Sequence, residues 1–387
     1  MIDAAVVKQL RLYVEQIAYA HKSTNPFHNF VRSCSVSMGA SKFLSKILDQ
    51  PAETLNDRVC LTNPLTQFGV IFATLVYGIA HPGVPNSVLV KENHHLASKY
   101  DYKDIAKKHA LDVAWEMLLE DTFDDLRNVL FATPADMTKL RQIVTVCIMS
   151  TDIYNDKLKE ARDHQWDTAG PSKKEVFQDQ HGNFECRPNA RTLDSANDGG
   201  CNDDVNGGVG DSNVVKKRGD SVDGLLHVMI PELRANLMME QIMQASNILH
   251  TMQHWHVYQK WNRRLFEEMY LAYEMGRDPV DPSTGWYEAE LTFFDEYVIP
   301  LAREMDKYQV FGVAGGECLS YATKNRKEWA VKGMDMVRTY VQEITNEDQV
   351  VGGATGARVE TTANASQDII HDDGEFDEGA STCTQEA

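Results

Sequence analysis

Apolar residues recur every three or four positions along most of the first 163 residues. This spacing places the apolar side chains of a segment on one face of a helix, and it is present in 7–18, 43–48, 106–121 and 135–161. Thr133 and Pro134, before the last segment, are typical of a helix start. Strand-like alternation is scarce. The pattern predicts a mostly helical body.

The composition changes abruptly after Arg162. Between Asp194 and Asn213 the chain has five Gly, five Asp and four Asn, with almost no large apolar residue. Such a stretch buries too little surface to offset the entropy lost on ordering. We therefore expect a flexible, disordered insertion over 163–222.

Helical spacing resumes at Leu225 and continues through 237–249, 256–273, 288–305 and 315–345. From Asn346 the chain is polar, Gly-rich and finally acidic, which predicts a disordered acidic tail over 346–387. The expected organisation is a single helical domain over 1–345, interrupted by the insertion.

Composition excludes some classes of function. A net charge of -19 argues against nucleic acid as a partner. The longest apolar run, 68–80, is shorter than the roughly 20 residues of a membrane span, so we expect no membrane contact from this chain itself. The start of the chain does not resemble a signal peptide, and seven cysteines without a Cys-x-x-Cys pair are typical of reduced thiols. We expect a cytoplasmic protein, or the cytosolic part of a longer membrane-bound one.

Two segments carry candidate chemistry. Asn25 to Arg32 reads Asn-Pro-Phe-His-Asn-Phe-Val-Arg, and Tyr77 to Asn86 begins Tyr-Gly-Ile-Ala-His-Pro-Gly. They resemble the class I 3′,5′-cyclic-nucleotide phosphodiesterases, which have His-Asn-x-x-His-Ala and His-Asp-x-Asp-His-Pro-Gly. Further segments resemble the family in the same order, at 91–97, 150–153, 245–261 and 290–301. The resemblance covers 20–335 and implies a compact all-α domain of about sixteen helices with a deep pocket.

The resemblance implies a two-metal centre, which uses zinc and magnesium to activate water and hold the phosphate. Its four ligand positions, two His and two Asp in the family, are Arg32, Tyr77, Gly78 and Asn247 here. Arginine cannot lose its proton, the Tyr77 phenol resists ionisation, glycine has no side chain, and Asn247 lacks a negative charge. We therefore predict no metal and no other cofactor.

Other family positions keep their residues. His28 occupies the general-acid position, and we expect it to be idle without a metal-activated nucleophile. The residues at supporting positions are His81, Asn86, Glu92, His95 and Asp152. We expect them to hold a polar interior together by hydrogen bonds.

Arg32 has two interpretations. A guanidinium can bind phosphate in a bidentate manner, so Arg32 could hold a cyclic nucleotide without cleaving it. The alternative is an ion pair with a remaining carboxylate such as Asp152 or Glu92.

Two residues match the nucleotide pocket of the family. Phe293 matches the aromatic residue that stacks on the base, and Glu290 replaces an amide that contacts the purine edge. A carboxylate accepts from the N1–H and amino group of guanine but opposes N1 of adenine, which predicts cGMP over cAMP. The alternative is that Glu290 faces solvent because the register is off by one.

His250, His254 and His256 could suggest a metal site, since histidines four apart can share an ion. Their aromatic neighbours and the lack of a nearby carboxylate favour a packed aromatic face instead.

Three functions follow. The first is a catalytically inactive phosphodiesterase-like domain that regulates or scaffolds cyclic-nucleotide signalling, with an active phosphodiesterase or a cyclase as partner. The second is a cyclic-nucleotide sensor that prefers cGMP. The third is an active enzyme with a displaced metal site built from His28, His81, His95 and Asp152.

Overall fold

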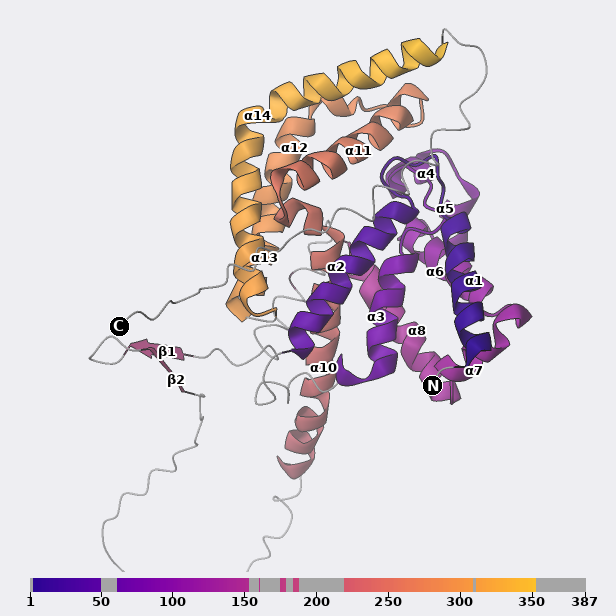
Figure 1. The fold of residues 1–387 in the computed structure, drawn as a ribbon, viewed down its shortest axis with the longest axis vertical. Coiled ribbons are helices and arrows are strands. Elements are labelled where there is room, and N and C mark those ends of the chain that lie inside the picture. Colours follow the sequence, from indigo (N-terminus) through magenta and orange to yellow (C-terminus); the bar gives the residue numbers. More distant parts are fainter. Residues whose placement is uncertain are drawn as a thin grey trace, which may run out of the picture. The chain divides into compact units, whose positions relative to one another are not determined.

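The structure is a computed structural model that describes residues 3–49, 61–152, 160, 175–178, 184–187, 219–308 and 311–352. The helical elements are α1 (Ala4–Ala20), α2 (Phe30–Leu48), α3 (Pro64–Val76), α4 (Asn86–Lys91), α5 (His95–Lys99), α6 (Ile105–Leu118), η2 (Asp121–Phe123), α7 (Asp124–Leu130), α8 (Pro134–Met149), α10 (Gly219–Asn247), η3 (Leu249–Met252), α11 (Trp255–Glu274), η4 (Pro282–Thr284), α12 (Trp286–Phe293), η5 (Phe294–Val298), α13 (Ile299–Tyr308) and α14 (Val313–Gly352). Helices dominate the described residues, which confirms the all-α class (Figure 1).

The predicted insertion has some described structure. Strands β1 (Glu175–Gln178) and β2 (Phe184–Arg187) pair antiparallel, with Glu175 opposite Arg187. Helix α10 begins at Gly219, before the predicted end of the insertion at residue 222. The rest of 163–222 lies outside the described residues.

The structure also differs from the prediction at the start of the tail, where residue 346 still lies in a helix. Helix α14 continues past residue 345 and ends at Gly352, the first residue of a Gly-Gly pair in the sequence. Residues 353–387 lie outside the described residues. The chain divides into two units within this helix, Met1–Val337 and Arg338–Ala387.

Local sequence explains where the helices of the first unit begin. Asn29 and Asn63 cap α2 and α3 with their side chains, and α3 then starts with Pro64. Thr133 and Asp136 form a reciprocal capping box at the start of α8. Each of these three helices therefore begins directly after a capping residue.

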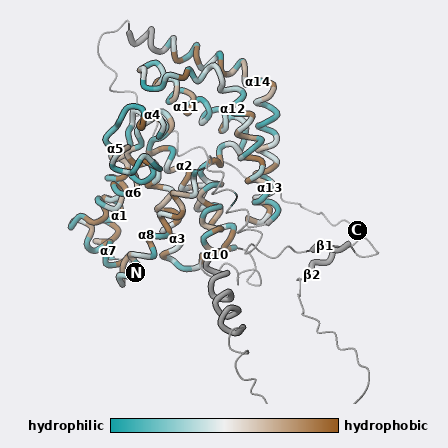
Figure 2. The backbone as a smooth tube through the Cα atoms, turned by 180° about the vertical axis from the view of Figure 1, so that it is seen from behind, coloured by the Kyte–Doolittle hydropathy of each residue, from teal (hydrophilic) through white to brown (hydrophobic). Residues whose placement is uncertain are grey.

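The core around α2, α3, α8 and α10 positions the candidate site. Apolar residues run along α3 (Figure 2), which packs against both α2 and α8. Helix α2 approaches the end of α10 closely at Gly39, where an added Cβ would lie 2.8 Å from the side chain of Leu249. This contact brings the middle of α2 next to the end of α10 and the start of η3.

A second packed region surrounds α11. The ring of Tyr258 lies 5.3 Å from Phe294 and 5.8 Å from Trp329, both at steep angles. These contacts tie α11 to η5 and to the first part of α14. In the part of the chain described here, no helix combines the length and the apolar character that crossing a membrane requires.

Candidate functional site

A buried arginine lies at the start of α2. The Oδ1 of Asn29 accepts a hydrogen bond from the backbone N–H of Arg32 at 3.1 Å. The Arg32 side chain is 2% exposed. Its guanidinium carbon lies 4.8 Å from the ring centroid of Phe27 and 4.9 Å from that of Trp261. Two aromatic rings, one from the segment before α2 and one from α11, therefore hold the cation.

The polar contacts of Arg32 go to the segment after α10. Its Nη2 donates to the backbone carbonyl of Asn247 and to Nδ1 of His250, 3.2 Å away. Asn247 thus contributes its main chain to this contact. Because arginine only donates, Nδ1 of His250 is an acceptor. Burial and the charge of Arg32 lower the pKa of His250 well below its usual range, so this histidine is neutral.

Tyr77, the C-cap of α3, faces the same cation. Burial raises the pKa of Tyr77, although the charge of Arg32 favours the phenolate. The Tyr77 hydroxyl and Nε of Arg32 are both buried, and neither has a hydrogen-bond partner of acceptable geometry. Within the described residues Arg32 forms no ion pair, with Asp152 or Glu92 or any other acid.

The space beside Gly78 is filled by a hydrogen-bonded pair. Nδ1 of His21 donates a hydrogen bond to the carbonyl of Ile17 at 2.8 Å. Its Nε2 is hydrogen-bonded to the Ser33 hydroxyl at 2.9 Å. A Cβ added to Gly78 would lie 3.3 Å from Ser33 Oγ and 3.4 Å from His21 Nε2. A longer side chain at this position would need both groups to move.

His28 and Glu268 form an ion pair that joins the loop before α2 to α11. Their Nδ1 and Oε1 atoms are 2.5 Å apart, and Oε2 accepts from the backbone N–H groups of Phe27 at 2.9 Å and His28 at 2.8 Å. Glu268 is 5% exposed. Burial alone would raise its pKa, but the charge and hydrogen bonds of His28 lower it to about 2. Both oxygens of the Glu268 carboxylate therefore accept hydrogen bonds.

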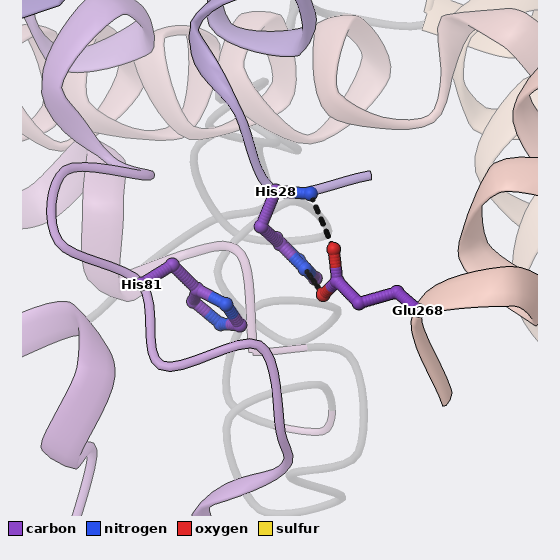
Figure 3. Close-up of side chains that lie close together, drawn as sticks. All are labelled: His28, His81 and Glu268. Atoms are coloured by element: carbon purple, nitrogen blue, oxygen red, sulfur yellow. Dashed lines mark hydrogen bonds and ion pairs between the residues drawn. The ribbon is translucent and has the colours of Figure 1, made fainter. Parts of the chain in front are cut away.

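His81 stacks on His28 (Figure 3), with ring centroids 3.7 Å apart and planes inclined by 23°. Its Nδ1 accepts from the backbone N–H of Gly83 at 3.2 Å. Burial and then the charge of His28 lower the pKa of His81 well below its usual range, and Glu268 opposes this only in part. His81 is therefore a neutral histidine against a charged pair.

These residues do not fit the zinc centre that the resemblance implies. Arg32 is a buried cation at one predicted ligand position, and at another a side chain on Gly78 would be crowded by Ser33 and His21. The potential ligand atoms of His28, His81 and Glu268 do lie within 4.8 Å of one another. However, nearly parallel rings cannot direct their in-plane lone pairs at one ion about 2.1 Å from each. The arrangement suits hydrogen bonding.

The other predicted supporting residues lie apart from this cluster. Oδ1 of Asn86 accepts from the backbone N–H of Ala106 at 3.2 Å and links α4 to α6. Glu92 forms a bidentate pair with Arg277 at 2.9 and 3.0 Å, and these bonds lower its pKa. Asn86 is half-buried, but Glu92 is exposed, so its pair with Arg277 lies at the surface and not in the polar interior predicted for it.

His95 and Asp152 have different neighbours again. The ring of His95 lies 4.4 Å from that of His94. The charge of Asp152 acts on Lys107, whose pKa is lowered mainly by burial. The described residues therefore bring His28 and His81 together as potential ligands, with Glu268 in place of His95 and Asp152.

Glu290 is buried rather than facing solvent. It is 8% exposed, and its Oε2 accepts from the hydroxyl of Tyr258 at 2.8 Å. Burial raises the pKa of Glu290 to about 7, although hydrogen bonds from Tyr258 and Asn262 oppose the shift. Phe293, one turn later on α12, is half-buried and stacks on Tyr297 with centroids 5.7 Å apart.

The sequence predicted no role at this site for Phe27, His21, Ser33, Trp261 and Glu268, and it placed His250 on a packed aromatic face. Glu268 follows Trp261 by seven residues and therefore lies on the same face of α11. A lone carboxylate on that aromatic face was a detectable signal of a buried ion pair. His250 and His254 do not share an ion, because His254 contacts the hydroxyl of Tyr321 at 3.1 Å.

Known proteins resemble this chain in sequence. A family model described as 3′5′-cyclic nucleotide phosphodiesterase matches residues 27–309. A probable 3′,5′-cyclic-AMP phosphodiesterase of Caenorhabditis elegans is 28% identical over 134 residues, which are 34% of this chain and 18% of that protein. The high affinity cAMP-specific and IBMX-insensitive 3′,5′-cyclic phosphodiesterase 8A of Mus musculus is 28% identical over 145 residues, 37% of this chain and 16% of that protein. Each alignment thus spans less than a fifth of the relative's length.

Solved structures share the fold. The phosphodiesterase domain of Salpingoeca rosetta rhodopsin phosphodiesterase has a TM-score of 0.55 at 15% identity, covering 89% of this chain and 84% of that one. A second structure of the phosphodiesterase domain from the same organism's RhoPDE fusion protein has a TM-score of 0.57 at 15% identity, covering 88% and 86%.

Proposed function

This chain belongs to the 3′5′-cyclic nucleotide phosphodiesterase family, and we propose that it is a member without hydrolytic activity. Arg32 carries this proposal. Its guanidinium is enclosed by Phe27 and Trp261 and bonded to the main chain at Asn247. A fixed positive charge at a predicted ligand position repels a dication. The residues around Arg32 contact its guanidinium and leave it in that position.

The surrounding groups support the same proposal. Hydrolysis at neutral pH needs a strong nucleophile, and a metal-bound water supplies it in this chemistry. His28 is bonded to Glu268 and stacked on His81, so it still resembles a positioned acid. A general acid alone contributes only ~10²–10⁴-fold. The expected turnover is therefore negligible.

We propose a regulatory or scaffolding role in cyclic-nucleotide signalling, in the cytoplasm or in the cytosolic part of a longer membrane-bound protein. A partner would be an active phosphodiesterase or a cyclase. Retention of the family fold without its metal ligands supports a role in binding over one in chemistry.

The test is hydrolysis of cAMP and cGMP by the purified chain with Mg²⁺ or Mn²⁺, beside an active phosphodiesterase measured in the same buffer. We expect no turnover above buffer from this chain. Turnover that is proportional to protein concentration and lost in His28→Ala would contradict the proposal.

A second candidate function is a cGMP sensor, and the buried position of Glu290 excludes the alternative that this residue faces solvent. The two relatives are described as cyclic-AMP and cAMP-specific phosphodiesterases, so the proposed preference for cGMP rests on Glu290 alone. Above pH 7 this carboxylate is increasingly ionised and can accept from guanine. In this candidate Phe293 stacks on the base, and Arg32 would bind the phosphate only after its aromatic enclosure opens.

Calorimetry with cGMP and cAMP at pH 8 tests this candidate. We expect tighter binding of cGMP, and Glu290→Gln should remove the preference. The absence of cGMP binding at millimolar concentration, or the same affinities for Arg32→Ala and wild type, would count against it. The third candidate, a displaced metal site, has no support from the geometry of His28 and His81.

A further inference from the structure

Arg32 and Tyr77 each have a buried polar group without a well-aligned hydrogen-bond partner. These groups are the Nε–H of Arg32 and the hydroxyl of Tyr77. Buried donors are nearly always hydrogen-bonded, because leaving one unsatisfied costs roughly 1–3 kcal/mol. A mutual side-chain contact acts on the pKa of both residues, so the two groups lie within reach of one another, but this contact lacks the alignment of a full hydrogen bond.

The charge of Arg32 also lacks a counter-charge among the described residues. Its polar contacts are the carbonyl of Asn247 and the neutral ring of His250. Tyr77 is neutral as well. Glu268, the acid that acts on Tyr77, has both oxygens bonded to Phe27 and His28. A buried charge without compensation is costly.

We propose that Arg32 and Tyr77 together bind one small inorganic anion, such as chloride. An anion accepts from both donors and compensates the guanidinium, whereas a water molecule would satisfy only the hydrogen bonds. The proposed site binds an anion at the positions where the sequence resemblance predicts the ligands of a metal cation.

The enclosure restricts the size of this anion. Arg32 is 2% exposed and lies against the rings of Phe27 and Trp261. The phosphate of a nucleotide remains attached to its sugar and base, so it cannot enter while these rings stay in place. A free halide has no such attachment. The proposed anion is therefore distinct from the nucleotide of the sensor candidate, and it does not depend on the proposed function.

Thermal unfolding at constant ionic strength tests the proposal without any nucleotide. In wild type, replacing sodium gluconate with sodium chloride should raise the midpoint by about 2–4 °C once the anion exceeds its dissociation constant roughly tenfold. Tyr77→Phe removes one donor and keeps the ring, so its rise should be smaller. Arg32→Met should show no rise, and Tyr19→Phe at an exposed tyrosine should behave as wild type.

Equal midpoints in gluconate and chloride would overturn the proposal, as would a full rise in Tyr77→Phe. If Arg32→Met does not fold, Tyr77→Phe decides the outcome. Crystals soaked in sodium bromide give a direct view. Anomalous density within hydrogen-bond distance of Arg32 Nε and Tyr77 Oη supports the proposal, and bromide found only at other positions overturns it.

Discussion

Arg32 donates a hydrogen bond to Nδ1 of His250 across 3.2 Å, so a buried cation is bonded to a histidine that stays neutral. The contact fills a position where the sequence resemblance predicts a metal ligand. It also links the start of α2 to the segment after α10, so the charged residue stabilises the packing of these two elements.

Removing this side chain should destabilise the domain. Arg32→Ala leaves a cavity between Phe27 and Trp261 and leaves the Asn247 carbonyl and His250 Nδ1 without a donor. We expect the free energy of unfolding to fall by about 2–4 kcal/mol. Urea denaturation measures the change, and Arg11→Ala at an exposed position is the control. Equal losses in both variants would exclude a stabilising role for Arg32.

Glu268 should make the domain sensitive to acid. Its pKa in the folded state is about 2, below the ordinary value of 4.5. It therefore adds stability above pH 4.5, and this stability is lost as the pH falls towards 2. The contribution is up to about 3 kcal/mol. The difference in unfolding free energy between wild type and Glu268→Gln should shrink over this range, while Glu288→Gln should follow wild type. A difference independent of pH would refute the ion pair.

Glu290 should act in the opposite direction. Its folded pKa of about 7 lies above the ordinary 4.5, so the protonated form is favoured in the folded state. Its contribution is greatest below pH 4.5, and up to about 3 kcal/mol is lost as the pH rises to 7. Compared with Glu290→Gln, wild type should lose stability between pH 4.5 and 7 and then change in parallel. Parallel curves throughout would place Glu290 in contact with water.

The sequence predicted the helices and the family better than the interior of the site. Periodicity and the helix start at Thr133 and Pro134 are local signals, and the structure contains the corresponding helix α8. The ligand positions could be identified because the loop around His28 and His81 keeps the family pattern. These signals do not depend on long-range packing.

The partners of those residues depend on long-range packing and could not be read from a motif. Glu268 lies 240 positions from His28, and His250 lies 218 from Arg32. The His21–Ser33 pair fills the space at Gly78 through contacts that no pattern encodes. The sequence left open whether Arg32 pairs with Glu92. In the structure Glu92 forms an ion pair with Arg277 instead.

Restoring one ligand should not restore the site. Gly78→Asp places a Cβ 3.3 Å from Ser33 Oγ, and the remaining side chain must displace Ser33 or His21. We expect a loss of about 1–3 kcal/mol in unfolding free energy. The loss should be smaller in a Ser33→Ala background, which a double-mutant cycle measures. The same cost in both backgrounds would show that the His21–Ser33 pair does not occupy that space.

Metal stoichiometry tests the central claim most directly. The chain is equilibrated with Zn²⁺, dialysed, and analysed for zinc per chain by mass spectrometry, with an active phosphodiesterase treated in parallel. We predict no stoichiometric zinc in this chain, because Arg32 and the His21–Ser33 pair occupy the predicted ligand positions. One zinc per chain, lost in His28→Ala or His81→Ala and accompanied by hydrolysis of a cyclic nucleotide, would contradict it.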